Sequence, residues 1–239
     1  MPPDQAGFDR GAAVTRSLLG WGVVAGPFYV VVGLILALTR PGFDLTRDAL
    51  SLLMLGEHGW MQQTNAALSA LMVLAAAYGV LRTLRSGRGL AIGSLTAVYG
   101  ICLGLSAVFL PAPTEQFPPE QSGEIVSAGG ILHLVFGALG FVALAAAAFS
   151  YARWAASRSE SRHVQLGAWC GSTILVGFIA GAALAQFPIG VAALWIAVLA
   201  GWLWLALTSA HLYTVAPHPV ISERQQPPSD PSAGGSTSA

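Results

Sequence analysis

Residues that could do chemistry are concentrated in one segment, RPGFDLTRDALSLLMLGEHGWMQQTN, which runs from residue 40 to residue 65. Arginine guanidinium groups bind phosphates and carboxylates through paired hydrogen bonds, and histidine gains or loses a proton near neutral pH. The segment therefore suits either a network of ion pairs or a contact with an anionic ligand. Its charged or titratable members are Arg40, Asp44, Arg47, Asp48, Glu57 and His58, and its amide side chains include Gln62 and Asn65.

No further motif defines a reaction. Patterns such as GxSxG, HExxH or paired carboxylates do not occur in the sequence. Cys102 and Cys170 stand alone, so neither a redox pair nor a cysteine zinc site is expected. His133 and His211 fall near opposite ends of their predicted helices and cannot bind one haem iron. We therefore predict no metal and no cofactor, and the sequence identifies no catalytic residue.

The elements that position the polar segment are predicted membrane helices. Hydrophobic residues make up 54% of the chain and charged residues only 9%, whereas soluble proteins average about 25% charged residues. A helix needs about 20 apolar residues to cross the hydrocarbon core of a bilayer. Six stretches meet this requirement, and Pro188 separates the last two. They cover residues 17–39, 60–84, 90–110, 127–154, 164–187 and 189–215, so the predicted fold is an all-α, six-helix transmembrane bundle.

The arginines orient this bundle, because short cytoplasmic loops of membrane proteins retain positive charge. All 11 basic residues are arginines, and nine of them fall on one side if the N-terminus is cytoplasmic. Only Arg40 and Arg47 fall on the other side. We therefore predict that both termini are cytoplasmic and that the loop beginning at Arg40 is external. The protein is expected in the bacterial cytoplasmic membrane.

The chain divides into a short flexible lead (residues 1–13), the six-helix domain (14–215) and a disordered cytoplasmic tail (216–239). The tail is rich in proline, serine and glycine, and neither end segment can bury enough apolar surface to fold alone. A cleaved signal peptide is the alternative for the first apolar stretch. That stretch is longer than the 7 to 15 or so apolar residues of a typical signal peptide, and Gly26-Pro27 suggests a packed, kinked helix instead.

His133 is the ionisable side chain placed furthest inside an apolar stretch, and such residues are functional candidates. It shares a face of its helix with Gly130, Gly137 and Gly140. Helical rise places it roughly 9 Å from the external boundary, and it places Asn65 at a similar depth, roughly 7.5 Å. Gln62, Asn65 and Ser69 share one face of the second helix. This stripe and His133 form either a polar pocket under the external loop or a simple interhelical hydrogen-bonded link.

The residues resemble a known family. The series Arg40-Pro41-Gly42-Phe43-Asp44, Arg47, Ser51, Leu53, Gly56, Gly59-Trp60, Gln62 and Asn65, followed by His133, is similar to the bacterial domain-of-unknown-function 998 family of six-helix membrane proteins. The likeness spans roughly residues 18–213. The loop LPAPTEQFPP, residues 110–119, lacks an aspartate-proline pair expected in such proteins. The resemblance implies the fold and the placement of polar residues, but it supplies no activity.

Three functions are compatible with these features. The first is binding or transport of a small or lipid-like ligand through an external polar pocket. Gln62, Asn65 and His133 would form this pocket, with Arg40 and Arg47 at its mouth. The second is a membrane-embedded enzyme that acts on a lipid or prenyl substrate with His133 as base and Asp48, Glu57 or His58 as its partner. The third is an accessory or assembly subunit of a membrane complex. The lipid bilayer is the expected partner in each case, and no nucleic-acid partner is expected.

Overall fold

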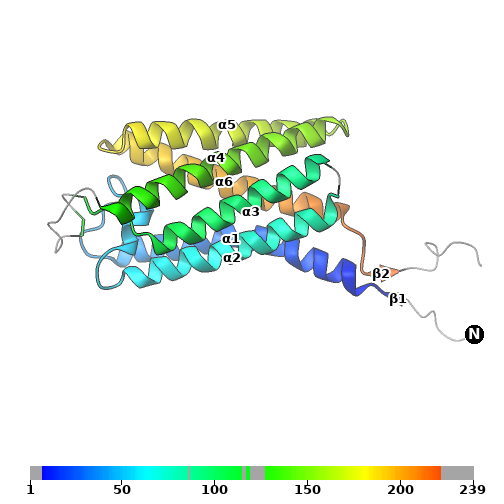
Figure 1. The fold of residues 1–239 in the computed structure, drawn as a ribbon, viewed down its shortest axis with the longest axis horizontal. Helices are drawn as coiled ribbons and strands as arrows, with labels where there is room; N and C mark the ends of the chain where they lie inside the picture. The colour runs from blue at the N-terminus through cyan, green and yellow to red at the C-terminus, as the bar shows by residue number, and fades with distance from the viewer. Residues whose placement is uncertain (1–6, 86, 115–116, 119–126, 222–239) are drawn as a thin grey trace, which may run out of the picture.

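The computed structural model of the chain describes residues 7–85, 87–114, 117–118 and 127–221. These residues form a bundle of long helices (Figure 1). A short 3-10 helix, η1 (Leu50–Met54), lies in the polar segment, and the strands β1 (Gly7–Phe8) and β2 (Val220–Ile221) pair antiparallel. The long helices are α1 (Arg10–Thr39), α2 (Gly59–Thr83), α3 (Gly87–Val108), α4 (Ala128–Ala156), α5 (Ser161–Ala183) and α6 (Pro188–Val215).

Each long helix packs against the next one in the sequence, and α1 also packs against α6, so the six helices form a closed ring. Figure 1 shows β1, β2 and the α2–α3 and α4–α5 turns at one end, which we call the terminal end. The α1–α2 segment, the end of α3 and the start of α4 lie at the other end, which we call the loop end. Which end faces the cytoplasm stays a prediction.

The six predicted spans are confirmed, because each of the six helices is long and apolar enough to cross a membrane. The break at Pro188 is also confirmed, since α5 ends at Ala183 and Pro188 opens α6. Helix α1 begins earlier than predicted, at Arg10, where Asp9 Oδ1 accepts a hydrogen bond from the Ala12 backbone N–H at 3.1 Å. Most of the predicted disordered tail, residues 222–239, lies outside the described residues.

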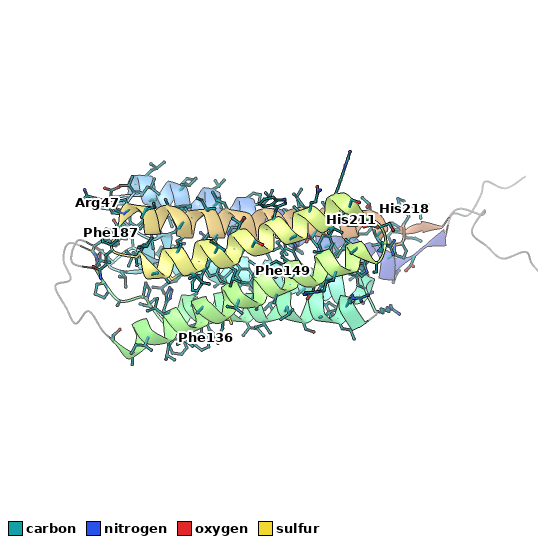
Figure 2. All side chains as sticks on the ribbon, turned by 90° about the horizontal axis from the view of Figure 1, so that it is seen from above. Arg47, Phe136, Phe149, Phe187, His211 and His218 are labelled. Atoms are coloured by element: carbon teal, nitrogen blue, oxygen red, sulfur yellow. The ribbon has the colours of Figure 1, made fainter. Side chains whose placement is uncertain are left out.

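Alanine and glycine make up much of the interior of the ring, together with a few large side chains such as Trp204 and Tyr151, while many large apolar side chains point outward (Figure 2). Lipid tails are as apolar as leucine, so membrane helices gain little from burying large side chains and pack through small ones. Alanines with no exposed surface include Ala66, Ala76, Ala147, Ala148 and Ala155. Each helix exposes large apolar residues, for example Val31, Leu71, Ile101, Leu134, Trp169 and Leu203.

Glycines bring the backbones of neighbouring helices together. A methyl group added at Gly167 on α5 would lie 2.6 Å from the Ala148 carbonyl oxygen on α4. A methyl group at Gly177 would lie 2.8 Å from the Ala193 carbonyl oxygen on α6. Both distances are shorter than van der Waals contact, so only glycine fits these approaches. Gly137 on α4 differs, because nothing lies within 4 Å of a methyl group there.

Candidate functional site

The loop end is covered by the segment between α1 and α2. The leucines and methionine of η1 are buried against the helices, and Gln63 Nε2 donates to the Met54 carbonyl oxygen at 2.9 Å. Phe117 of the α3–α4 connection is fully buried against Leu52 and Leu55, and its ring meets Phe43 edge-on at 5.3 Å. The segment therefore folds back over the bundle as a packed cover.

The acids of this cover are held by the backbone more than by arginines. Asp48 is 4% exposed, and its Oδ2 accepts from the Asp44 backbone N–H at 2.8 Å. Burial raises the pKa of Asp48, and that hydrogen bond opposes the rise. Hydrogen bonds from the Thr46 hydroxyl and backbone N–H lower the pKa of Asp44. The Arg47 side chain, 61% exposed, reaches the Asp44 carboxylate only at 3.9 Å. Exposed pairs of this kind contribute little to stability, because water and salt screen them.

Arg40 differs from Arg47 because it lies partly buried at the end of α1. Its Nη2 donates to the Leu55 carbonyl oxygen at 2.8 Å, and its guanidinium lies 5.7 Å from the Phe117 ring centroid. Gly56, with a backbone φ of +73°, lies beside it, and a methyl group there would collide with Nη2. Within the described part of the chain, no carboxylate lies within 4.0 Å of the Arg40 guanidinium. Arg40 thus keeps a charge and N–H donors for another acceptor.

A pocket of about 200 Å³ lies beside Arg40 at the loop end. Its polar wall is formed by Thr39, Arg40 and His58, and the rest of its lining is Leu36, Pro41, Leu53 and Met61. Pockets for drug-sized ligands are larger, roughly 300–1,000 Å³. The space suits one small anionic group or part of a lipid.

Gln62 and Asn65 are not part of the pocket lining. They are 0% and 2% exposed, and Asn65 Nδ2 donates to Gln62 Oε1 at 3.0 Å and to the Tyr29 carbonyl oxygen of α1 at 3.1 Å. Ser69 is buried on the same face, as the predicted stripe requires. Gln62 Nε2, Asn65 Oδ1 and Ser69 Oγ find no hydrogen-bond partner among the described residues. The stripe connects α2 to α1.

His133 bonds to a different helix. Its Nδ1 lies 2.8 Å from the Phe109 carbonyl oxygen and 3.0 Å from the Ser106 carbonyl oxygen. Carbonyl oxygens only accept hydrogen bonds, so Nδ1 carries the proton. The last carbonyls of a helix lack intrahelical partners, and these two lie at and just beyond the end of α3. His133 therefore caps α3 from α4.

Asn65 and His133 make their hydrogen bonds to carbonyls of different helices. The hydrogen bonds described for Asn65 connect α2 to α1, whereas those of His133 connect α4 to α3. Periodicity and depth place both side chains near the loop end, but they do not identify the neighbouring helix. Of the other predicted site residues, Arg40 and His58 line the pocket. Asp44, Arg47 and Asp48 belong to the cover and do not line the pocket. Glu57 is exposed.

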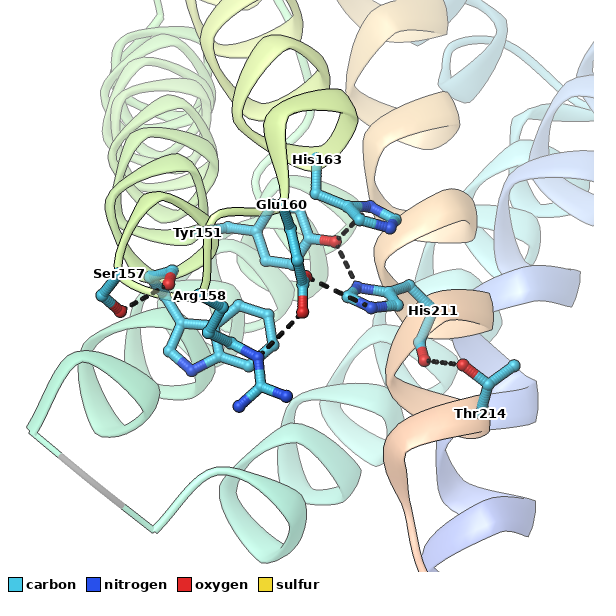
Figure 3. A network of polar contacts seen from close by, with 8 residues as sticks. Tyr151, Ser157, Arg158, Glu160, His163, His211 and Thr214 are labelled. Atoms are coloured by element: carbon cyan, nitrogen blue, oxygen red, sulfur yellow. Dashed lines mark hydrogen bonds and ion pairs between the residues drawn. The ribbon is translucent and has the colours of Figure 1, made fainter.

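A second polar cluster, at the terminal end, was not anticipated. It joins Tyr151 of α4, Glu160 and His163 at the start of α5, and His211 of α6 (Figure 3). Figure 2 shows His211 and Arg47 at opposite ends of the bundle. The spacing Glu160-x-x-His163 at a helix start was the available sequence signal, because it places two possible metal ligands on one helix turn.

Six apolar helices with large side chains turned outward define a multi-pass membrane protein. Within that class, the chain belongs to the family described as "Protein of unknown function (DUF998)", which it matches over residues 23–211. The match confirms the family resemblance seen in the sequence, and it extends from within α1 to near the end of α6. No curated protein and no solved structure matches the chain.

Proposed function

We propose that the protein binds or transports a small or lipid-like ligand that carries an anionic group, through the pocket at the loop end. The observation that carries this proposal is the position of Arg40, a partly buried cation in the wall of an otherwise largely apolar pocket. Guanidinium groups bind phosphate and carboxylate oxygens through two parallel hydrogen bonds. The apolar wall suits an acyl chain or another hydrocarbon group attached to the anion.

The arginine distribution supports an external position for this pocket, in a bacterial cytoplasmic membrane with both termini inside. In that orientation an anionic lipid of the outer leaflet reaches Arg40 with its headgroup. Asn65, which also bonds to Gln62, supports the pocket indirectly by holding α2 against α1, since both helices contribute to its lining. His133 as a catalytic base has less support, because its Nδ1–H is engaged with the end of α3 and no hydroxyl or carboxylate of the described residues is hydrogen-bonded to its Nε2.

The test compares Arg40→Gln with Arg47→Gln in the purified full-length protein. Phosphatidylglycerol and phosphatidylethanolamine are titrated in detergent and their binding is measured by native mass spectrometry. Arg40→Gln is expected to weaken phosphatidylglycerol binding about 10- to 100-fold, as for the loss of a hydrogen bond to a charged group. Arg47→Gln is the matched control, because Arg47 is exposed and lies outside the pocket lining. Equal binding of phosphatidylglycerol by both variants and the wild type would refute the proposal.

A further inference from the structure

The cluster at the terminal end brings together side chains from three helices. Tyr151 lies near the end of α4, Glu160 immediately precedes α5, His163 lies in its first turn, and His211 lies in the last turns of α6. Possible ligand atoms of Glu160, His163 and His211 all lie within 4.8 Å of one another. All three side chains are partly buried, so the group is both positioned by the fold and open to small ions.

The hydroxyl of Tyr151 organises the two imidazole rings. It lies 2.9 Å from His163 Nδ1 and 2.7 Å from His211 Nδ1 (Figure 3). A phenol oxygen has lone pairs for N–H donors, so both rings can place their proton on Nδ1 and donate to it. In that tautomer each Nε2 keeps a free lone pair. Metal-binding histidines are held in the same way, by a hydrogen bond from the nitrogen that does not bind the metal.

Glu160 supplies an oxygen on the same side. Its Oε1 accepts from Arg158 Nε at 2.9 Å, whereas Oε2 is buried and has no hydrogen-bond partner within the described part of the chain. That oxygen lies 3.5 Å from His211 Nε2. A buried carboxylate oxygen without a hydrogen-bond donor is costly. It faces the imidazole nitrogen whose lone pair is free in the tautomer above.

From this geometry we propose that Glu160, His163 and His211 form a binding site for a divalent first-row transition metal ion, with Zn²⁺ as the representative ion. Two imidazoles and one carboxylate are a ligand set that Zn²⁺ accepts, with a further position left for water or substrate. The site lies at the opposite end of the bundle from the Arg40 pocket. It does not depend on the function proposed for that pocket.

Coordination requires one local movement. The rings of His163 and His211 are stacked, with centroids 3.6 Å apart and planes 9° from parallel. A nitrogen lone pair lies in the plane of its ring, so two parallel rings cannot direct both lone pairs at one ion. One imidazole must therefore turn until the two planes meet at the metal. Zn–N distances of about 2.0–2.1 Å would then replace the stacking contact.

The experiment measures Zn²⁺ binding to the full-length protein in detergent after treatment with EDTA. Isothermal titration calorimetry gives affinity and stoichiometry, and the visible absorption of Co²⁺ reports on coordination by imidazole and carboxylate. We expect one ion per chain. His163→Ala and His211→Ala are each expected to weaken binding about 100-fold or more, beyond the 10- to 100-fold typical of residues that only support a metal ligand. Glu160→Gln retains the side-chain shape and is expected to weaken binding at least about 10-fold by the same comparison.

Two further variants separate a metal site from a purely structural network. His218→Ala is the matched control, because His218 is exposed at the same end and, among the described residues, its Nδ1 accepts a hydrogen bond from the Val220 backbone N–H alone. Arg158→Gln removes the cation that competes with the metal ion for the Glu160 carboxylate. It should therefore raise the affinity for Zn²⁺ about 2- to 5-fold, which corresponds to the energy of an exposed ion pair. Absence of saturable Zn²⁺ binding by the wild type, or equal binding by His211→Ala and His218→Ala, overturns the proposal. The Co²⁺ spectrum of the wild type decides the matter if an alanine variant does not fold.

Discussion

Replacing Asn65 with leucine tests whether the buried amides of α2 stabilise the fold or contact a ligand. The change removes two hydrogen bonds, to the Tyr29 carbonyl oxygen at 3.1 Å and to Gln62 Oε1 at 3.0 Å. An interhelical hydrogen bond in a membrane protein contributes about 0.6 kcal/mol and at most about 1.7 kcal/mol. A buried Gln62 oxygen left without its donor adds about 1–3 kcal/mol. The expected loss in free energy of unfolding is therefore about 2–4 kcal/mol.

At about 2–4 °C per kcal/mol for a chain of this size, that loss lowers Tm by roughly 5–15 °C. Thermal unfolding in detergent, followed by circular dichroism, measures it. The double variant Gln62→Met with Asn65→Leu removes both partners of the hydrogen bond. Its loss in free energy of unfolding should therefore be smaller than the sum of the two single losses, by about 1–3 kcal/mol. Additive losses would contradict the reasoning. If Asn65→Leu leaves Tm unchanged but abolishes ligand binding, Asn65 contacts the ligand and does not stabilise the fold.

Two other predictions concern packing and pH. Gly167→Ala forces a methyl group against the Ala148 carbonyl oxygen and should lower Tm. Gly137→Ala meets open space, so the higher helix propensity of alanine should raise the free energy of unfolding by about 0.5–1 kcal/mol. Equal Tm values for the two variants in detergent would contradict this expectation. Burial raises the pKa of Asp48 above its ordinary 3.8, so its ionised form destabilises the cover above the raised pKa. The Tm of the wild type should therefore rise toward that of Asp48→Asn as the pH falls from 7 toward 4. A Tm difference between the two proteins that does not change with pH would refute the raised pKa of Asp48.

The helices were predictable because each depends on a local quantity, the length of an apolar stretch. Pro188 was equally local, since a proline lacks a backbone N–H and fits the first position of a helix, where it opens α6. The start of α1 at Arg10 was harder, because Asp9 caps it with a side-chain hydrogen bond to Ala12 and polar composition alone suggested a flexible lead. Local signals thus determined the number of helices better than their ends.

The site was predicted less completely because hydrogen-bond partners depend on which helices are neighbours. The sequence placed Asn65 and His133 at similar depth, but it did not reveal that α1 lies beside one and the end of α3 beside the other. His163 and His211 are brought together by the packing of α5 on α6, which the sequence pattern does not encode. Arg40 directly follows a predicted helix and lines the pocket in the structure, and its contact with a ligand stays a prediction.

The closed ring of helices also bears on how the protein is made. The contact between α1 and α6 joins parts of the chain that are synthesised far apart in time: Gly26 approaches Trp202, and Gly22 approaches Ser209. At about 5–20 residues per second, the ribosome needs roughly 10 to 35 seconds to reach Trp202 after Gly26. During that interval the small-residue face of α1 has no partner from α6. The first five helices can associate as they emerge, but the final contact waits for the sixth.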